Sequence, residues 1–492
     1  SSAFLKYADF SHYADYFNGM EDENIVQAIP NAKASEWMEE NIPLFECPQH
    51  NFEEMYYYRW WSIRKHIKET PVGYGMTEFL VQRSYSDKYN LIACAIGHHI
   101  YESRWLRDPK YLDQIIHTWY RGNDGGPMKK MDKFSSWNAD AVLARYMVDG
   151  DKDYLLDMKK DLETEYQRWE RTNRLKNGLY WQGDVQDGME ESISGGRKKK
   201  YARPTINSYM YGNAKALSCI GILSGDEGMA MKYGMKADTL KNLVENELWN
   251  TRHQFFETMR TDSSANVREA IGYIPWYFNL PDTTQKYEIA WKEIMDAKGF
   301  SAPYGLTTAE RRHPEFRTRG VGKCEWDGAI WPFASAQTLT AMANFMNNYP
   351  QTVLSDSVYF RQMELYVESQ YHRGRPYIGE YLDEVTGYWL KGDQERSRYY
   401  NHSTFNDLII TGLIGLRPRL DNTIEVNPLI PADKWEWFCL DNVLYHGHNL
   451  TILWDKNGDR YHCGKGLRIF VDGKEVGQAD TLTKIVCENA LK

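Results

Sequence analysis

Apolar residues recur at spacings of three and four along most of the chain, a pattern typical of helices that bury one face. It predicts about eleven helices. They span residues 50–68, 88–105, 109–120, 136–148, 153–171, 206–223, 227–247, 284–296, 330–347, 354–371 and 402–414. No sequence repeat of fixed length accompanies them, which disfavours a solenoid. Many antiparallel helix pairs around one core instead suggest closure into a ring.

The two ends of the chain have different patterns. The first residues are mixed and aromatic-rich, which predicts an irregular arm. Near the other end, short apolar runs such as 450–454 and 467–471 are separated by Asn-Gly and Asp-Gly turns, as in a small β domain. The sequence therefore predicts an N-terminal arm at 1–48, a helical domain at 49–415 and a C-terminal β domain at 416–492.

Composition narrows the possible partners. A net charge of -9 argues against nucleic acid, and no apolar run approaches the roughly 18 to 20 residues of a membrane-spanning helix. The seven cysteines are widely spaced without a CxxC pair, so we expect no disulfide framework, no metal site and no cofactor. A start at Ser1-Ser2 without an initiator Met suggests a trimmed form, and we expect a periplasmic or secreted protein.

Aromatic residues are abundant, at 14% of the chain. Their flat rings suit stacking on sugar faces, although a large helical fold also packs Trp and Tyr between its helices, and composition leaves both interpretations open. The long segments at 121–135, 173–205, 250–270, 298–329 and 372–401 are rich in Gly, Asp, Arg and Trp. Loops of this length are usually functional, so we expect one rim of the helical domain to carry the chemistry.

Carboxylates gather in two of these loops. The segment 180–192 holds four acids, Asp184, Asp187, Glu190 and Glu191, and crowded carboxyls can raise one another's pKa until one serves as a general acid. The segment 379–387 offers a second group, as hydrolysis of a glycosidic bond requires. Each loop, taken alone, also fits a solvated acidic turn.

A third block, Cys324 to Pro332, places Trp326 and Trp331 on either side of an Asp-Gly turn before a helix. Two tryptophans beside the carboxylate of Asp327 fit a sugar subsite, and they fit a packed helix start equally well. Composition and spacing do not decide between these two interpretations.

Together the three blocks resemble a clan of inverting glycosidases that includes trehalase, processing α-glucosidases and mannosylglycerate hydrolase. Gly188-Met189-Glu190-Glu191-Ser192 is similar to the clan's Gly-Met-Asp-Asn-Ser, with Glu in place of the acid Asp. Glu380-Tyr381-Leu382-Asp383-Glu384-Val385-Thr386-Gly387 is similar to its base motif, and the block from Glu325 to Pro332 resembles its tryptophan block, with Asp327 in place of Arg. The resemblance covers roughly residues 50–415. It implies a mainly α fold, an (α/α)6 barrel, with a small C-terminal β-sandwich domain.

The resemblance also implies roles. Glu190 corresponds to the general acid, with Asp187 as a competitor, and Glu380 to the general base. An inverting enzyme of this kind acts on an α-linked oligosaccharide or glycoside and holds its two carboxyls about 6.5 to 9.5 Å apart. We expect further substrate contacts from the stacking faces of Trp137, Trp326 and Trp331, from the polar groups of Asn138, Asp140, Asn207 and Asp327, and from the Arg203 guanidinium.

Two other functions remain open. A glycoside phosphorylase on the same barrel would need cations to bind phosphate at the second loop, where residues 379–387 carry carboxylates and no cation. A non-catalytic carbohydrate-binding protein could keep both the barrel and its aromatic residues. The change from the clan's Asp to Glu at position 190 is compatible with this alternative.

Overall fold

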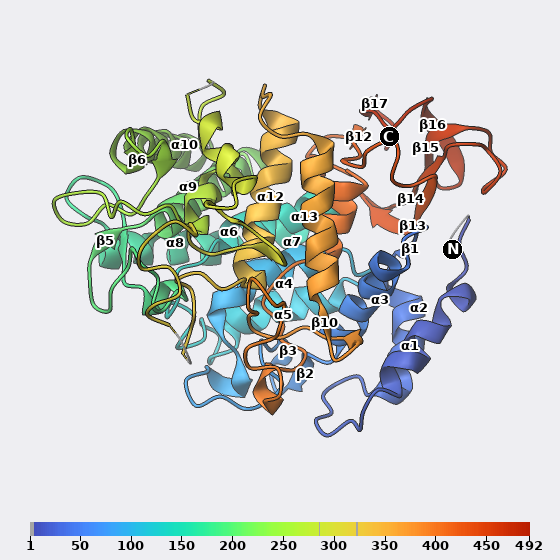
Figure 1. Cartoon of the computed structure of the whole chain (residues 1–492), viewed down its shortest axis with the longest axis horizontal. Coiled ribbons are helices and arrows are strands. Elements are labelled where there is room, and N and C mark those ends of the chain that lie inside the picture. Colours follow the sequence, from blue (N-terminus) through green and yellow to red (C-terminus); the bar gives the residue numbers. More distant parts are fainter. Residues whose placement is uncertain (1–3, 285, 321–322) are drawn as a thin grey trace.

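A computed structural model describes residues 4–284, 286–320 and 323–492 (Figure 1). Its α-helices are α1 (Ser11–Asn18), α2 (Ala34–Asn41), α3 (His50–Arg64), α4 (Ile96–Ser103), α5 (Lys110–Arg121), α6 (Asn138–Asp149), α7 (Lys152–Asp157), α8 (Lys159–Asn173), α9 (Pro204–Leu223), α10 (Glu227–Leu243), α11 (Ile274–Tyr277), α12 (Pro332–Asn348), α13 (Asp356–Ser369) and α14 (Asn406–Leu408). A 3-10 helix, η8, spans Glu288–Ile294. The fold is mainly helical, as the sequence predicts.

Six helices form a closed ring. Going around it, α4 contacts α6, α6 contacts α9, α9 contacts α11, α11 contacts α12, α12 contacts α14, and α14 returns to α4. These six helices form the inner ring. In the chain, α4, α6, α9, α11, α12 and α14 each follow an outer helical segment, which is α3, α5, α8, α10, η8 and α13, respectively. This is the arrangement of an (α/α)6 barrel, and the predicted ring closure is confirmed.

The apolar pattern explains which helices lie inside. Helix α9 is buried along most of its length, and besides its apolar residues it buries the polar Thr205, Asn207, Ser208 and Asn213. Helix α5 is amphipathic, and it buries Leu112, Ile115, Ile116 and Trp119 on one face while its charged residues face outward. The sequence pattern therefore agrees with the burial of both an inner helix, α9, and an outer helix, α5.

Several of the predicted helices are less regular than the spacing suggests: 153–171 breaks at Met158 between α7 and α8, and 284–296 contains the 3-10 helix η8. Only 96–103 of the predicted helix 88–105 is α-helical, because Tyr89 and Asn90 adopt positive φ angles of 66° and 63° that a right-handed helix excludes. The predicted helix 402–414 divides into the short α14 and a π-helix at Ile409–Leu413. Helical spacing alone does not detect such local changes of backbone geometry.

The prediction of an irregular N-terminal arm is wrong. Residues 1–48 contain α1, α2 and a strand, β1 (Leu44–Glu46), which pairs antiparallel with β13 (Trp437–Tyr445), Phe45 lying opposite Leu440. Figure 1 shows the blue β1 beside the red strands. The carboxylate of Asp441 also accepts hydrogen bonds from the main-chain N–H groups of Phe4 and Leu5, each at 2.8 Å. A strand of three residues carries no period of its own, so its partner decides its conformation.

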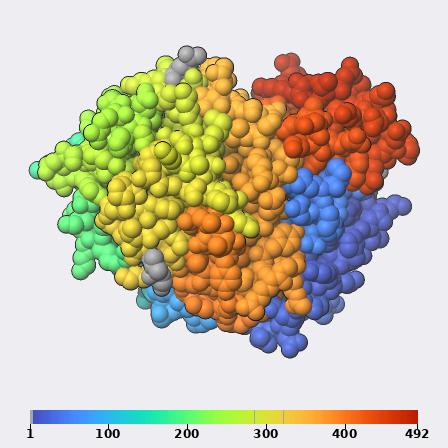
Figure 2. Space-filling model, in the orientation of Figure 1, coloured from blue at the N-terminus to red at the C-terminus, as the bar shows by residue number. Residues whose placement is uncertain are grey.

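The C-terminal region is all β. Its main sheet is antiparallel in the order β1, β13, β14 (His448–Asp455), β15 (Gly466–Val471) and β16 (Lys474–Ala479). A separate pair joins β12 (Ile424–Val426) to β17 (Ile485–Cys487). In the space-filling view this region forms a red lobe that borders the orange and blue segments (Figure 2).

Smaller hairpins connect the barrel helices. They are β2 (Ile67–Thr70) with β3 (Gly73–Met76), β4 (Trp181–Gln182) with β5 (Tyr201–Ala202), β6 (Trp249–Asn250) with β7 (Phe255–Phe256), β8 (Ser301–Ala302) with β9 (Gly305–Leu306), and β10 (Tyr371–His372) with β11 (Arg375–Pro376). Across the described ranges, none of the helices combines the length and the apolar character needed to cross a membrane.

Candidate active site

Three carboxyl groups from distant parts of the chain, Glu78, Glu190 and Glu380, line one cavity of about 380 Å³. This volume lies within the range of small-molecule sites. The other lining residues are Arg83, Tyr85, Ile92, Cys94, Lys133, Phe134, Val185, Gly188, Arg197, Cys324, Trp326, Trp331, Phe333, Arg396, Tyr400 and His402. Four of the five long loops contribute to this set, so the expectation that one rim gathers them is confirmed for 121–135, 173–205, 298–329 and 372–401.

Glu190 sits directly after a tight turn. Gly188 has a φ of +70°, and a Cβ there would lie 2.5 Å from the Cys94 sulfur, so only glycine lets the loop approach the barrel this closely. The Trp326 indole N–H donates to Glu190 Oε2 at 3.3 Å. Burial raises the pKa of Glu190 to about 7, and the charge of Glu380 adds to this effect. A carboxyl with this pKa still carries its proton near neutral pH and can donate it.

Glu380 has a different environment. Its carboxylate Oε1 lies 3.5 Å from Lys391 Nζ and 3.6 Å from a terminal guanidinium nitrogen of Arg396. Its Oε2 lies 3.0 Å from the Tyr400 hydroxyl oxygen. Two cations balance the charge of an ionised carboxylate, which is the form that a general base requires.

An aromatic wall completes the cavity. The rings of Trp326 and Trp331 stack with centroids 4.0 Å apart, and Trp331 stacks on Phe333 at 4.6 Å. Because all three residues line the cavity, the stack presents an apolar surface next to the acid that Trp326 contacts. The sequence interpretation of Trp326 and Trp331 as subsite residues fits this placement.

Asp187, the second candidate for the general acid, lies in a buried ion pair. Both its carboxylate and the Arg203 guanidinium are fully buried, and they form an ion pair with 2.8 Å between Arg203 Nε and Asp187 Oδ2. The hydroxyl groups of Ser135 and Thr205 also donate to Asp187. Neither Asp187 nor Arg203 is among the described residues that line the cavity, so the structure does not bring them together with Glu190 and Glu380 there. They hold the loop of Glu190 against the start of α9.

We expect Arg203→Met to lower the free energy of unfolding by about 3–5 kcal/mol, because it leaves the Asp187 charge buried without its cation. Urea denaturation measures this loss. Asp187→Asn in the Arg203→Met background removes the uncompensated charge and should restore part of the stability. A loss below about 1 kcal/mol, the value typical of exposed ion pairs, would contradict this structural role.

Trp137, Asn138 and Asn207 also lie away from the cavity, contrary to expectation. Trp137 is buried in the barrel, where its ring packs on Tyr209 and its indole N–H donates to the Tyr277 hydroxyl at 3.1 Å. The amide of Asn138 donates to Glu165 at 3.0 Å, and that of Asn207 bridges main-chain atoms of Tyr180. The amide nitrogens of both asparagines therefore serve contacts within the barrel.

Asp140 and Asp327, also expected to contact the substrate, are not among the described residues that line this cavity either. Asp140 lines a different cavity, together with Arg417 and Arg419 near the β domain, and it accepts a hydrogen bond from the Tyr101 hydroxyl at 2.5 Å. Asp327 is fully buried and accepts from the main-chain N–H groups of Arg319 and Gly320 at 2.7 and 3.1 Å. Its carboxylate shapes the loop that precedes Trp326.

Sequence reasoning missed Glu78, Tyr400 and the cations Lys133 and Arg396. Glu78 directly precedes the apolar run Phe79-Leu80-Val81, and an acid at the edge of such a run is the signal that could have revealed it. The two cations lie in loops with many exposed charges, where a further Lys or Arg carries no signal. Only the packing of the loops shows that they face the same cavity.

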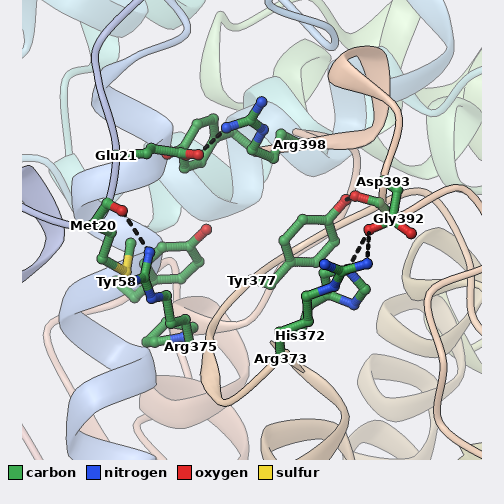
Figure 3. Close-up of a pocket in the computed structure, with 12 residues that line it drawn as sticks. Met20, Glu21, Tyr58, His372, Arg373, Arg375, Tyr377, Gly392, Asp393 and Arg398 are labelled. Carbon is green, nitrogen blue, oxygen red and sulfur yellow. Dashed lines mark hydrogen bonds and ion pairs between the residues drawn. The ribbon is translucent and has the colours of Figure 1, made fainter.

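A second cavity of about 500 Å³ lies beside α3 and the β10–β11 hairpin (Figure 3). Its acids already have cationic partners, because Glu21 pairs with Arg398 and Asp393 pairs with Arg373 at 2.9 Å. Figure 3 shows Arg375 directed at the main-chain oxygen of Met20, to which it donates at 2.5 Å. Glu190, in contrast, contacts an indole N–H and has a raised pKa, which favours the cavity of Glu190 and Glu380 as the candidate active site.

The described ranges of the chain contain no preformed metal-binding site. No group of three or more His, Cys, Asp or Glu side chains there is arranged to hold an ion.

Solved structures share this fold. A structure named "Sialidase" is 95% identical over the whole chain with a TM-score of 0.99, but this chain spans only 45% of that longer protein. A GH63 mannosylglycerate hydrolase from Thermus thermophilus, solved with glucose, is 12% identical and has a TM-score of 0.55, covering 72% of this chain and 99% of its own. A GH78 family rhamnosidase of Bacillus sp. GL1 is 11% identical with a TM-score of 0.61, over 87% of this chain and 41% of its own.

Family models match both parts of the chain. The C-terminal domain of glycosyl hydrolase family 65 matches residues 416–477. The mannosylglycerate hydrolase MGH1-like glycoside hydrolase domain matches residues 88–403, which is more than half of the chain and includes Glu190 and Glu380. The chain therefore belongs to the family of MGH1-like glycoside hydrolase domains.

Proposed function

We propose that the protein is an inverting glycoside hydrolase in which Glu190 is the general acid and Glu380 the general base. The observation that carries the proposal is the contrast between the two carboxyls of one cavity. Glu190 is desolvated and has its pKa raised to about 7, whereas Glu380 faces Lys391 and Arg396. Two carboxyls whose environments favour opposite protonation states are what acid and base catalysis needs.

The reaction follows from these states. Glu190 transfers its proton to the glycosidic oxygen as the bond from that oxygen to the anomeric carbon breaks. Glu380 removes a proton from a water molecule whose oxygen attacks the anomeric carbon from the opposite face. The product then has the inverted configuration, and the mechanism requires room for this water, with carboxyls about 6.5 to 9.5 Å apart.

For the substrate we propose an α-linked glycoside or short oligosaccharide. A cavity of about 380 Å³ fits a terminal sugar and its neighbour better than a long chain. The names of the similar structures mention mannosylglycerate, rhamnosides and, through the word sialidase, sialic acid glycosides. Because this chain covers 45% of the protein named sialidase, a sialoside is one member of a test panel rather than the proposed substrate.

A phosphorylase is the second candidate, and one observation favours it. Although residues 379–387 lack a cation, folding brings Lys391 and Arg396 against Glu380. Cations at this place could bind phosphate. In the structure, however, they already pair with a carboxylate, which supports hydrolysis with water as the acceptor.

The deciding experiment follows the anomeric configuration of the released sugar by NMR, during cleavage of a panel of aryl and natural α-glycosides, β-glycosides and sialosides, with and without phosphate. We expect the inverted free sugar, released at the same rate in both buffers. Retention of configuration would overturn the inverting mechanism, and formation of a sugar phosphate would identify a phosphorylase. Activity confined to β-glycosides or to sialosides would overturn the proposed α-linkage or substrate.

A further inference from the structure

Glu78 places a third carboxyl in the catalytic cavity, next to β3. Its side chain is 6% exposed, and its main-chain oxygen accepts a hydrogen bond from Asn401 N at 2.9 Å. The amide of Asn401 also donates to the main-chain oxygen of Thr77 at 3.0 Å. These bonds join the segment of Glu78 to the segment that carries Tyr400, so the two side chains are held together.

The Tyr400 hydroxyl lies between two carboxyls. Its oxygen is 2.9 Å from Glu78 Oε2 and 3.0 Å from Glu380 Oε2. Burial raises the pKa of Tyr400 far above its usual value, so the phenol keeps its single proton and can donate it to only one of them. The carboxyl that does not receive the Tyr400 proton faces only the lone pairs of the phenol oxygen. If that carboxyl were ionised, its oxygen would be buried there without a hydrogen-bond donor. One of the two carboxyls must therefore be protonated and donate to the Tyr400 oxygen.

The surroundings indicate which carboxyl carries the proton. Glu380 lies within 3.6 Å of two cations, which compensate its charge. Burial raises the pKa of Glu78 to about 8, and the charges of Glu380 and Glu190 raise it further, although the bond to Tyr400 opposes them. The proton belongs on Glu78, and the Tyr400 hydroxyl then points to Glu380.

We propose that Glu78 is a positioning residue of the hydrolytic reaction: it works as a protonated acid, donates to the Tyr400 oxygen, and so directs the Tyr400 hydroxyl to the base Glu380. This inference rests on the proposed function. The chain of two hydrogen bonds fixes one oxygen of Glu380, while the other faces Lys391 and Arg396. Because the Glu380 carboxylate is held in one orientation, it contacts the attacking water in one geometry.

The charges around Glu78 set the pH range of this arrangement. The charged groups that line the same cavity are Glu190, Glu380, Arg83, Lys133, Arg197 and Arg396. Cys94, Tyr85 and Tyr400 have raised pKa values and His402 a lowered one, through burial, so all four are neutral near pH 7. As the pH rises through about 8, Glu78 loses its proton. The donor to Tyr400 then disappears and a third negative charge enters the cavity.

Infrared spectroscopy tests the protonation without any substrate. We compare the wild type with Glu78→Gln between pH 5 and 10, in the range where protonated carboxyls absorb. We expect a band that is present at neutral pH, absent in Glu78→Gln and lost with a midpoint near pH 8. If no such difference band exists at neutral pH, Glu78 is ionised and the inference fails. Because this readout needs no turnover, it is independent of whether the proposed reaction is correct.

Kinetics test the positioning role with matched variants. The amide of Glu78→Gln can donate to Tyr400 at every pH, whereas Glu78→Leu has a similar size and no donor. At pH 6.5 we expect kcat within about threefold of wild type for Glu78→Gln and at least about tenfold lower for Glu78→Leu, with KM changed less than about twofold. An aryl glycoside with a good leaving group removes the need for Glu190. On it, the wild type should lose activity above about pH 8, and Glu78→Gln should not.

Tyr400→Phe provides the last control, because it removes the hydroxyl between the two carboxyls. In this background we expect Glu78→Gln and Glu78→Leu to have equal kcat values. Equal loss in Glu78→Gln and Glu78→Leu with Tyr400 present would overturn the inference, since it would mean that the charged carboxylate is needed. Circular dichroism and melting curves show that each variant is folded before its kinetics are compared.

Discussion

Glu380→Gln is expected to lower kcat by about 10²–10⁴, with a small change in KM, because the amide cannot accept a proton from the attacking water. Gln keeps the size of Glu and can still accept a hydrogen bond from Tyr400, so the cavity should stay intact. Steady-state kinetics on any glycoside that the wild type cleaves measure the effect.

Glu384→Gln is the matched control for this variant. Glu384 belongs to the same loop, but it pairs with Arg317 at 2.8 Å and is not among the described residues that line the cavity. The same change of charge there should leave kcat within about threefold of wild type. If both variants lose activity equally, the loop needs its charges for folding, and Glu380 is not the base.

Glu190→Gln is expected to lower kcat/KM by about 10²–10⁴ on substrates with a poor leaving group, because no proton reaches the departing oxygen. On an aryl glycoside whose leaving group departs as a stable anion, the loss should be far smaller. Glu191→Gln, at the neighbouring position, is the matched control and should resemble the wild type on both substrates. An equal loss on both substrates would show that Glu190 does not act as the acid.

The same residue sets a pH dependence. In the proposed mechanism the protonated form of Glu190 is the active one, and the pKa of Glu190 is raised to about 7. Wild-type kcat/KM on a substrate with a poor leaving group should therefore hold below pH 7 and fall as the pH rises through 7. In Glu190→Gln this fall should disappear, since the amide does not titrate. A fall at the same pH in Glu190→Gln would assign it to another group.

Much of the fold follows from local patterns. The helical period of the central region is a property of neighbouring residues, and helices such as α5 and α9 lie close to their predicted ranges. The alternation and turns after residue 416 likewise predict a β region. Strand β1 escaped prediction because its hydrogen-bond partners are in β13, at the other end of the chain.

The active site was only partly predictable. Loop acids in recognisable motifs pointed to Glu190 and Glu380, and the tryptophan block pointed to Trp326 and Trp331. The same reasoning assigned Asp187 to catalysis and Arg203 and Asn207 to substrate binding. A polar side chain in a loop looks the same in the sequence whether it faces a cavity or a buried partner, and only packing separates the two.

The sequence by itself determined the helical period, the β region near the C-terminus and the motifs that carry Glu190 and Glu380, because these depend on residues close together in the chain. Tertiary structure alone decided that Asp187 pairs with Arg203, that Lys391 and Arg396 face Glu380, and that Glu78 meets Tyr400. Burial and charge set the protonation of a carboxyl, and both depend on groups that only folding brings near.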